Sequence, residues 1–105
     1  MDIIDLPEPL EFEWDEGNKH KNLLKHRISI EECEQIFGRD DFITFTDTKH
    51  SYKEPRYVIF GKNKQEKILS IAFTIRGRKI RIISARPAGN RERKLYEEEI
   101  SLAKV

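Results

Sequence analysis

Residues 78–92 have the sequence Arg78-Lys-Ile-Arg-Ile-Ile-Ser-Ala-Arg-Pro-Ala-Gly-Asn-Arg-Glu92. This stretch predicts an apolar strand that carries cations and leads through a turn into a basic helix. Gly77-Arg78 precedes the strand and suits a two-residue type II′ turn, because glycine at the first central position tolerates the backbone that this turn requires. The pattern therefore predicts an antiparallel hairpin of residues 68–76 and 79–86, in which the turn determines the register.

In this register the hairpin has an apolar face and a basic face. The apolar face is predicted to bear Leu69, Ile71, Phe73, Ile75, Ile80, Ile82 and Ser84. The basic face is predicted to bear Ser70, Ala72, Thr74, Arg76, Lys79, Arg81, Ile83 and Ala85. A slip by one residue would bury Arg81 opposite Phe73, which would leave an unpaired charge in the core. Strand parity puts Arg86 on the core side, so its reach to the basic face depends on the turn that follows it.

Shorter patterns predict the elements around the hairpin. Ser29 and Glu32 form a capping box that starts a helix, and Gly38 is a fitting end for it. We further expect a strand over 10–14, a helix over 15–26, strands over 42–46 and 56–61, and a last helix capped by Asn90. The predicted order is β-α-α-β-β-β-β-α. This is an α+β fold, in which helices pack on one face of an antiparallel sheet and leave the other face free.

Length and composition predict a single domain over residues 1–105 with one core. Residues 1–9 are expected to be a loose leader, because Pro7 and Pro9 interrupt regular pairing. The net charge is only +1, so an anionic partner must be bound through the local distribution of charge. One cysteine, with no signal peptide or long apolar run, predicts a protein of the reducing cytoplasm without membrane contact.

A larger set of residues occurs in the order and spacing of a known family. They are Phe12-Glu-Trp-Asp15, Asn22, Lys25-His26, Ser29-Ile-Glu-Glu32, Ile36-Phe37, Asp47, His50, Arg56, Gly61, Thr74, Arg76-Gly77, Arg81-Ile-Ile-Ser-Ala-Arg86 and Tyr96. Over most of its length the chain thus resembles the BrnT family, toxins of bacterial type II toxin–antitoxin pairs. The run from Arg81 to Arg86 after an Arg-Gly turn is its most specific part. The family usually has glycine where Arg27 stands, at a helix end that needs a left-handed residue.

The resemblance implies a fold like that of the RelE ribonucleases. It implies a toxin that cleaves RNA without a metal or another cofactor and so inhibits translation. It also implies a partner, a BrnA-like antitoxin with a ribbon-helix-helix part, with two toxins expected on an antitoxin dimer. Operator DNA would then be bound only through the antitoxin. The charged turn over residues 62–67 lacks the family's usual Ser-Arg-Gly-Arg-like character, which leaves its part in RNA binding open.

Metal-independent cleavage of RNA needs a base for the 2′-hydroxyl, cations for the charge that grows on the phosphate, and an acid for the 5′-oxygen. His50 is the best candidate for proton transfer, because imidazole titrates near neutral pH; a solvated loop histidine is the alternative. Arg56, Arg81 and Arg86 are the other catalytic candidates, because a guanidinium matches phosphate with two hydrogen bonds. Alternatively, these arginines form structural ion pairs with the acidic first strand or with residues 97–99.

Further residues are candidates for contact with RNA. They are Glu54, Thr74, Arg76, Lys79, Arg91, Arg93 and Tyr96. Glu54 is also a second candidate for the base. Tyr96 could stack on a nucleobase, although its place among the apolar residues of the last helix favours core packing. Cys33 is expected to be a small buried residue. The histidines and Cys33 lack the compact spacing of zinc ligands, so no metal site is expected.

Two classes of function fit these patterns. The first is the ribonuclease toxin, whose basic sheet face carries the site and is covered by the antitoxin. The acidic segments could instead attract a basic part of the antitoxin and place part of that interface on the helices. The second class is a non-catalytic module that binds nucleic acid or protein through the same basic face. Incubation with RNA in EDTA separates the two, because only the enzyme leaves 2′,3′-cyclic phosphate ends.

Overall fold

The computed structural model describes residues 4–14, 27–50 and 53–103, without the side chain of His50. This part of the chain forms a five-stranded sheet in the order β1-β5-β4-β3-β2. The elements are β1 (Phe12–Trp14), α2 (Ile30–Phe37), β2 (Ile43–Thr46), the 3-10 helix η1 (Thr48–His50), β3 (Tyr57–Lys62), β4 (Ile68–Arg76), β5 (Lys79–Pro87) and α3 (Asn90–Ala103). The helix predicted over 15–26 lies outside the described residues. No described helix is long and apolar enough to cross a membrane.

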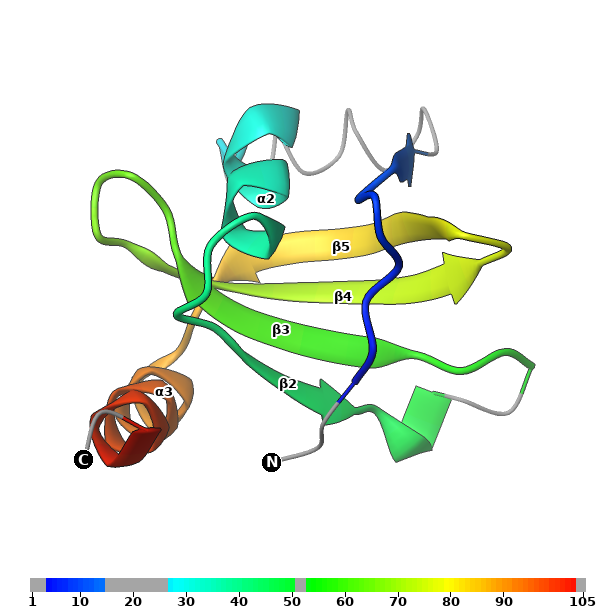
Figure 1. The fold of residues 1–105 in the computed structure, drawn as a ribbon. Helices are drawn as coiled ribbons and strands as arrows, with labels where there is room; N and C mark the ends of the chain where they lie inside the picture. Colours follow the sequence, from blue (N-terminus) through cyan, green and yellow to red (C-terminus); the bar gives the residue numbers. More distant parts are fainter. Residues whose placement is uncertain (1–3, 15–26, 51–52, 104–105) are drawn as a thin grey trace.

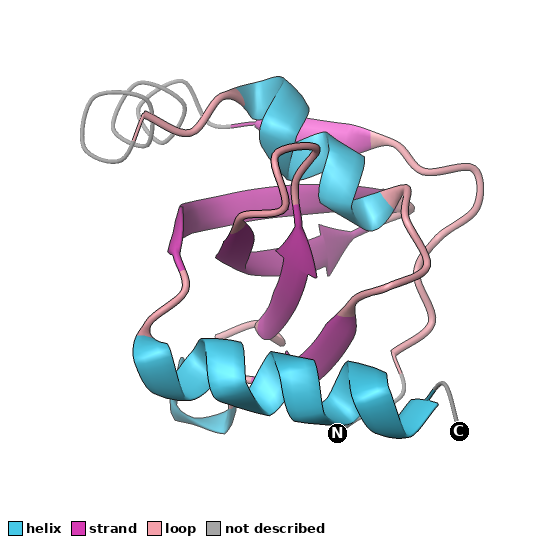
Figure 2. Ribbon diagram, turned by 90° about the vertical axis from the view of Figure 1, so that its left-hand side faces the viewer, coloured by secondary structure: helices cyan, strands magenta, loops and turns pink. Residues whose placement is uncertain are grey.

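The predicted α+β class is confirmed, but the two helices do not share one face of the sheet. Figure 1 and Figure 2 show α2 on one side of the sheet and α3 on the other. The reason lies in β3, where Ile59 belongs to the core cluster under α2, whereas Val58 and Phe60 pack in the cluster of α3. An uninterrupted apolar run of this kind is typical of a strand that is covered on both faces.

The sheet is mixed, because β1 pairs with β5 in parallel, with Glu13 beside Arg81. The predicted sheet was antiparallel throughout, an expectation that the structure corrects for this one strand. Side chains on α2 hold β1 in place. The Trp14 indole Nε1 donates a hydrogen bond of 3.0 Å to Glu34 Oε2, and the rings of Phe12 and Phe37 meet edge to face with centroids 5.5 Å apart.

The capping box that was predicted for α2 is confirmed. Glu32 N donates to Ser29 Oγ, and Ser29 N donates to Glu32 Oε1, each at 3.2 Å. The helix packs close to β3 at Gly61, where an added Cβ would lie 2.5 Å from Ile36 Cγ2. Gly61 is therefore required by the approach of α2 to the sheet, since real Cβ atoms do not come so close to carbon.

The hairpin of β4 and β5 forms around Gly77-Arg78, and its register is as predicted from the turn as far as Ile82. Beyond Ile82 a β-bulge leaves Ile83 without a Cα partner on β4. Ala85 consequently turns to the core, where it is 1% exposed, and Arg86 turns to the opposite face. The predicted faces of Ser84, Ala85 and Arg86 are thus reversed, because a bulge adds one residue to one strand and shifts its parity.

Two local expectations concern the chain before α2. Leu6 and Leu10 pack against the larger core cluster, so the predicted loose leader is held to the domain from Leu6 onward. Arg27 has a φ of 55°, which is the left-handed conformation that the resemblance implied for this position. An arginine adopts it at a cost, because its Cβ approaches the following carbonyl.

Candidate functional site

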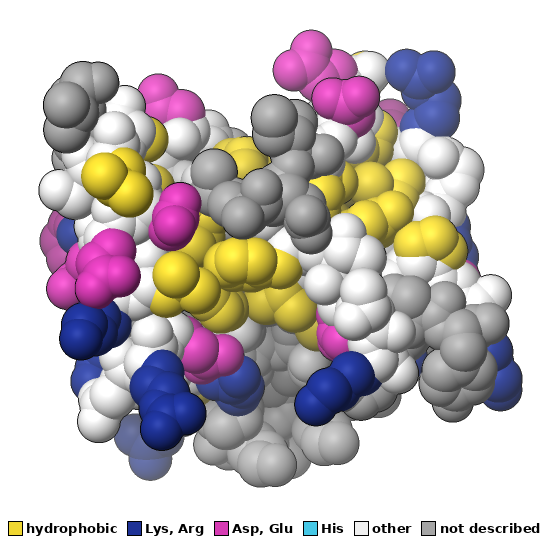
Figure 3. All heavy atoms as spheres, turned by 90° about the horizontal axis from the view of Figure 1, so that it is seen from below, with side chains coloured by type: hydrophobic (Ala, Val, Ile, Leu, Met, Phe, Trp, Pro, Cys, Tyr) yellow, Lys and Arg dark blue, Asp and Glu magenta, His cyan; other side chains and the backbone are white. Residues whose placement is uncertain are grey.

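The candidate site lies on the side of the sheet that α3 partly covers, which we call the α3 face. Its strand residues include Val58 and Ala72, which are Cα partners on β3 and β4. Both side chains are partly exposed, as is that of Ile83 at the bulge. Figure 3 views the molecule from this side and shows hydrophobic side chains gathered in the middle, with lysines, arginines and acids around them. The face thus combines an apolar floor with a charged border.

Glu54 binds Arg76 at the turn end of the hairpin on this face, and the charges of two further arginines act on its carboxylate. Arg76 Nε and Nη2 donate hydrogen bonds of 3.0 Å each to the two carboxylate oxygens of Glu54. These hydrogen bonds lower the pKa of Glu54, and the charges of Arg56 and Arg81 lower it further. We call Arg56, Arg76 and Arg81 the arginine cluster. Because its pKa is lowered, the Glu54 carboxylate accepts a proton less readily near neutral pH. Glu54 is therefore a weaker candidate for the base.

Arg81 also has a carboxylate partner on the neighbouring strand. Its Nη1 lies 3.1 Å from Oε1 of Glu13, and the two side chains are 21% and 42% exposed. On its other side Arg81 faces Thr74, its Cα partner on β4. Arg81 is thus fixed in the middle of the sheet and still partly open to solvent.

Thr74 does not reach the surface, so the structure corrects its expected contact with RNA. The side chain is fully buried, and its hydroxyl donates a hydrogen bond to the main-chain oxygen of Pro55. The next residue of this loop, Arg56, accepts a main-chain hydrogen bond of 2.8 Å from Asp47. Thr74 therefore holds the segment that carries Glu54 and Arg56 against the sheet.

Arg86 lies apart from the arginine cluster. It follows Arg81 by five residues on β5, which corresponds to about 16 Å along a strand. Its guanidinium makes two hydrogen bonds, of 2.6 and 2.8 Å, to the carboxylate of Glu92 on α3. The bulge brings Arg86 to the α3 face, where Glu92 holds its guanidinium, whereas Glu54 and Glu13 hold Arg76 and Arg81.

The remaining candidates lie on or near α3. Tyr96 is 1% exposed, and its hydroxyl donates a hydrogen bond to the main-chain oxygen of Asp41. Burial raises its pKa to about 12. The expected contact of Tyr96 with RNA is therefore corrected to core packing. Lys79, Arg91 and Arg93 are exposed and stay candidates for RNA contact.

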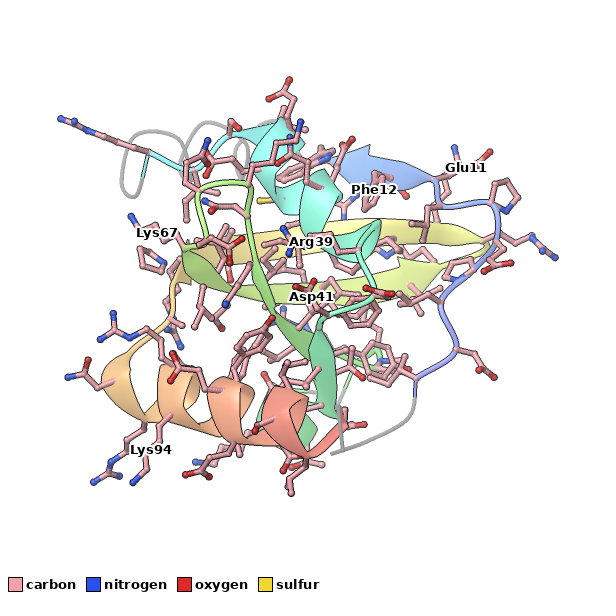
Figure 4. All side chains as sticks on the ribbon, turned by 60° about the vertical axis from the view of Figure 1, so that its left-hand side comes forward. Glu11, Phe12, Arg39, Asp41, Lys67 and Lys94 are labelled. Carbon is pink, nitrogen blue, oxygen red and sulfur yellow. The ribbon has the colours of Figure 1, made fainter. Side chains whose placement is uncertain are left out.

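Figure 4 shows Arg39 and Asp41 close together on the segment that leads from α2 to β2, and Lys94 on α3 pointing away from the sheet. Arg39 Nη2 lies 2.7 Å from Asp41 Oδ2. Because Tyr96 binds the main chain of Asp41, this segment and α3 brace each other. The ion pair of Arg39 and Asp41 therefore helps to hold α3 in place, and it is not part of the arginine cluster.

The part of the chain with described side chains does not include His50, so its role as proton donor or acceptor stays a prediction. The main chain of His50 ends η1, shortly before the loop that carries Glu54.

Cys33 is buried, and burial raises its pKa to about 12, as suits an inert core residue. Within the described residues no group of three His, Cys, Asp or Glu is placed to hold a metal ion.

Glu13 and Glu92, the carboxylates that hold Arg81 and Arg86, were not predicted by name, although an ion pair with the acidic first strand was one alternative for these arginines. The alternation of Phe12, Glu13 and Trp14 could have indicated Glu13, because it puts the acid on the face opposite the two aromatic residues. The pairing of β1 with β5 has no such local signal. Chemically, arginines arranged beside an apolar floor can hold phosphate oxygens while nucleobases lie on apolar side chains.

The chain was compared with known families and structures. A family model described as the ribonuclease toxin BrnT of a type II toxin–antitoxin system matches residues 14–92, well over half of the chain. The chain is also similar to the crystal structure of the Brucella abortus ribonuclease toxin BrnT, with a TM-score of 0.60 and 23% sequence identity. That match covers 77% of this chain and 99% of the Brucella chain, and it supports the shared fold. Comparison with curated proteins gives no match. The resemblance inferred from the sequence is confirmed, and the chain belongs to the BrnT family of ribonuclease toxins of type II toxin–antitoxin systems.

Proposed function

We propose that this toxin is a metal-independent endoribonuclease that cleaves RNA on the α3 face of its sheet and thereby inhibits translation. The observation that carries the proposal is that one part of the α3 face carries three arginines: Arg76 binds Glu54, and Arg81 lies beside Thr74, which holds the loop of Glu54 and Arg56 to the sheet. Such a group is suited to the negative charge that develops on a phosphate during in-line attack by the 2′-hydroxyl. The products would be a 2′,3′-cyclic phosphate and a 5′-hydroxyl.

Within the arginine cluster, Arg81 is the strongest candidate for contact with the reacting phosphate. Its side chain is 21% exposed, against 49% for Arg76 and 50% for Arg86. A charged donor in a partly dry place interacts more strongly with developing charge than one in water. Arg56 and Arg76 would support the neighbouring phosphate oxygens. Arg86 would contact a different nucleotide of the bound RNA.

His50 is proposed to transfer the proton. It ends η1, and Glu54 and Arg56 follow four and six residues later in the sequence. An imidazole is the ordinary side chain for this step near neutral pH. The low pKa of Glu54 favours His50 over Glu54 as the base.

The partner is proposed to be a BrnA-like antitoxin with a ribbon-helix-helix DNA-binding part. Two toxins would bind one antitoxin dimer, and the complex would contact operator DNA only through the antitoxin. We further propose that the toxin acts in the cytoplasm, where its RNA substrate is found. The molar mass of the co-purified complex, measured by light scattering, tests the stoichiometry.

Cleavage is tested with purified protein and a defined single-stranded RNA in buffer with EDTA. Fragments that end in 2′,3′-cyclic phosphate support the enzyme. Intact RNA that is bound with a steep dependence on salt would instead support a non-catalytic binding module. A parallel reaction with the RNA carrying 2′-deoxyribose at the cleaved position is the control, because it lacks the attacking hydroxyl.

A further inference from the structure

Glu13 is held on the α3 face by its two neighbours on β1. Phe12 and Trp14 both pack against the larger core cluster on the other face. Figure 4 shows Phe12 on the side of β1 toward α2. Successive side chains of a strand point to opposite faces. With aromatic anchors before and after it, Glu13 has only the α3 face to occupy.

The pairing of β1 with β5 brings Glu13 to one arginine in particular. Glu13 and Arg81 are Cα partners in the parallel register, and Glu13 Oε1 accepts a hydrogen bond of 3.1 Å from Arg81 Nη1. The contact joins residues that are 68 positions apart in the sequence. An edge strand of three residues therefore brings one carboxylate to the hairpin close to its turn.

We propose that Glu13 is a positioning residue, which orients the guanidinium of Arg81 for the phosphate without itself contacting the RNA. This inference rests on the proposed function of Arg81. An arginine side chain has many rotamers, and fixing it before the substrate binds removes an entropic cost from the reaction. A carboxylate on a strand that is anchored on both sides provides such a fixed point.

Two other readings of the ion pair make different predictions. If Glu13 only stabilised the fold, its loss would lower the melting temperature; a pair this exposed contributes little to stability. If Glu13 only competed with RNA for Arg81, its loss would strengthen RNA binding and raise the rate. A positioning role predicts instead a slower reaction at saturating RNA with no loss of affinity.

The test uses Glu13→Gln, which keeps the size of the side chain and removes its charge. Glu11→Gln is the matched control, because it makes the same charge change at an exposed residue near β1. Single-turnover rates are measured at saturating protein, and affinity is measured with RNA that carries 2′-deoxyribose at the cleaved position. We expect Glu13→Gln to be roughly tenfold slower at saturation, with unchanged or tighter binding and an unchanged melting temperature. Glu13→Asp, which retains the charge, should recover part of the rate.

A saturating rate for Glu13→Gln equal to that of the control would overturn the positioning role, as would a rate loss that follows a loss of melting temperature. The proposed function fails separately, if the wild-type protein leaves RNA intact or if Arg81→Ala cleaves normally. Adding Glu13→Gln to Arg81→Ala should have no further effect on rate, because residues that act through one contact are not additive. A further tenfold loss in the double variant would show that Glu13 acts elsewhere.

Discussion

The guanidinium of Arg86 and the carboxylate of Glu92 form a two-point ion pair, with N–O distances of 2.6 and 2.8 Å. Glu92 Oε1 also accepts a hydrogen bond of 2.8 Å from the main-chain nitrogen of Gly89. One carboxylate therefore ties the end of β5, the following turn and the first turn of α3 together. The acid lies near the positive end of the helix dipole, which favours its charged form.

The ion pair predicts a pH-dependent part of the stability. Its hydrogen bonds with Arg86 lower the pKa of Glu92 in the folded protein. The contribution is therefore complete above the ordinary glutamate pKa and is lost as the pH falls through the lowered folded pKa. Glu92→Gln should cost about 1 kcal/mol or less near neutral pH, and the difference from wild type in urea unfolding should shrink toward acid pH. A difference that is constant with pH would contradict this origin.

Gly61→Ala should destabilise the protein by about 1–3 kcal/mol, because the new Cβ would overlap Ile36 of α2 and force the helix away from β3. Thermal and urea unfolding measure the loss. Gly38→Ala is the control, since a Cβ there would meet Gln35 O at an ordinary 3.6 Å. Equal effects of the two substitutions would mean that α2 does not approach β3 as described.

Arg27→Gly should stabilise the protein by roughly 0.5–1 kcal/mol, because glycine adopts the left-handed conformation of this residue without strain. The gain is reduced by the greater freedom of glycine in the unfolded chain. Arg27→Ala should gain little, since alanine also has a Cβ. If both variants gain equally in urea unfolding, the loss of the arginine charge is the cause.

Arg81→Ala should reduce single-turnover cleavage by about 10²–10³-fold, the usual effect of removing one donor to developing charge. The growth arrest caused by expression should be relieved. Lys94→Ala, at an exposed cation of α3 that points away from the sheet, is the control and should keep most of the rate. A large drop in melting temperature for Arg81→Ala would mark the residue as structural.

His50→Gln should cut the single-turnover rate by about 10²-fold or more while RNA affinity changes little. Glutamine retains hydrogen bonding but does not titrate near neutral pH. The rate of the wild type should depend on pH with the titration of an imidazole, and that dependence should be absent in the variant. An unchanged rate would remove His50 from the mechanism.

Local sequence signals predicted most of the fold. The capping box at Ser29, the Gly77-Arg78 turn and the register as far as Ile82 all appear in the structure where the sequence placed them. These features depend on neighbouring residues in the chain. The bulge at Ile83 and the parallel pairing of β1 depend on contacts between distant segments, so local sequence patterns did not predict them.

The candidate site was predicted only in part, because its ion pairs also join distant segments of the chain. Strand parity indicated that Arg76 and Arg81 share a face, but it could not indicate which acids would meet them. The partners come from β1 and from the loop before β3, as Glu13 and Glu54. Tyr96, which belongs to the family pattern, is buried against Ile43 of β2 and Phe60 of β3, and its hydroxyl binds the main chain of Asp41.

The bulge in β5 decides which side chains after Ile82 point to the core and which point to solvent. With the same residues but no bulge, ordinary alternation over the five positions from Arg81 to Arg86 would turn the second guanidinium into the core and the methyl group of Ala85 out to solvent. The bulge and the number of residues between the two arginines therefore have to match, since a change in one without the other exchanges the inward and outward side chains. A relative that lacks one residue here keeps both arginines on one surface only if it also lacks the bulge.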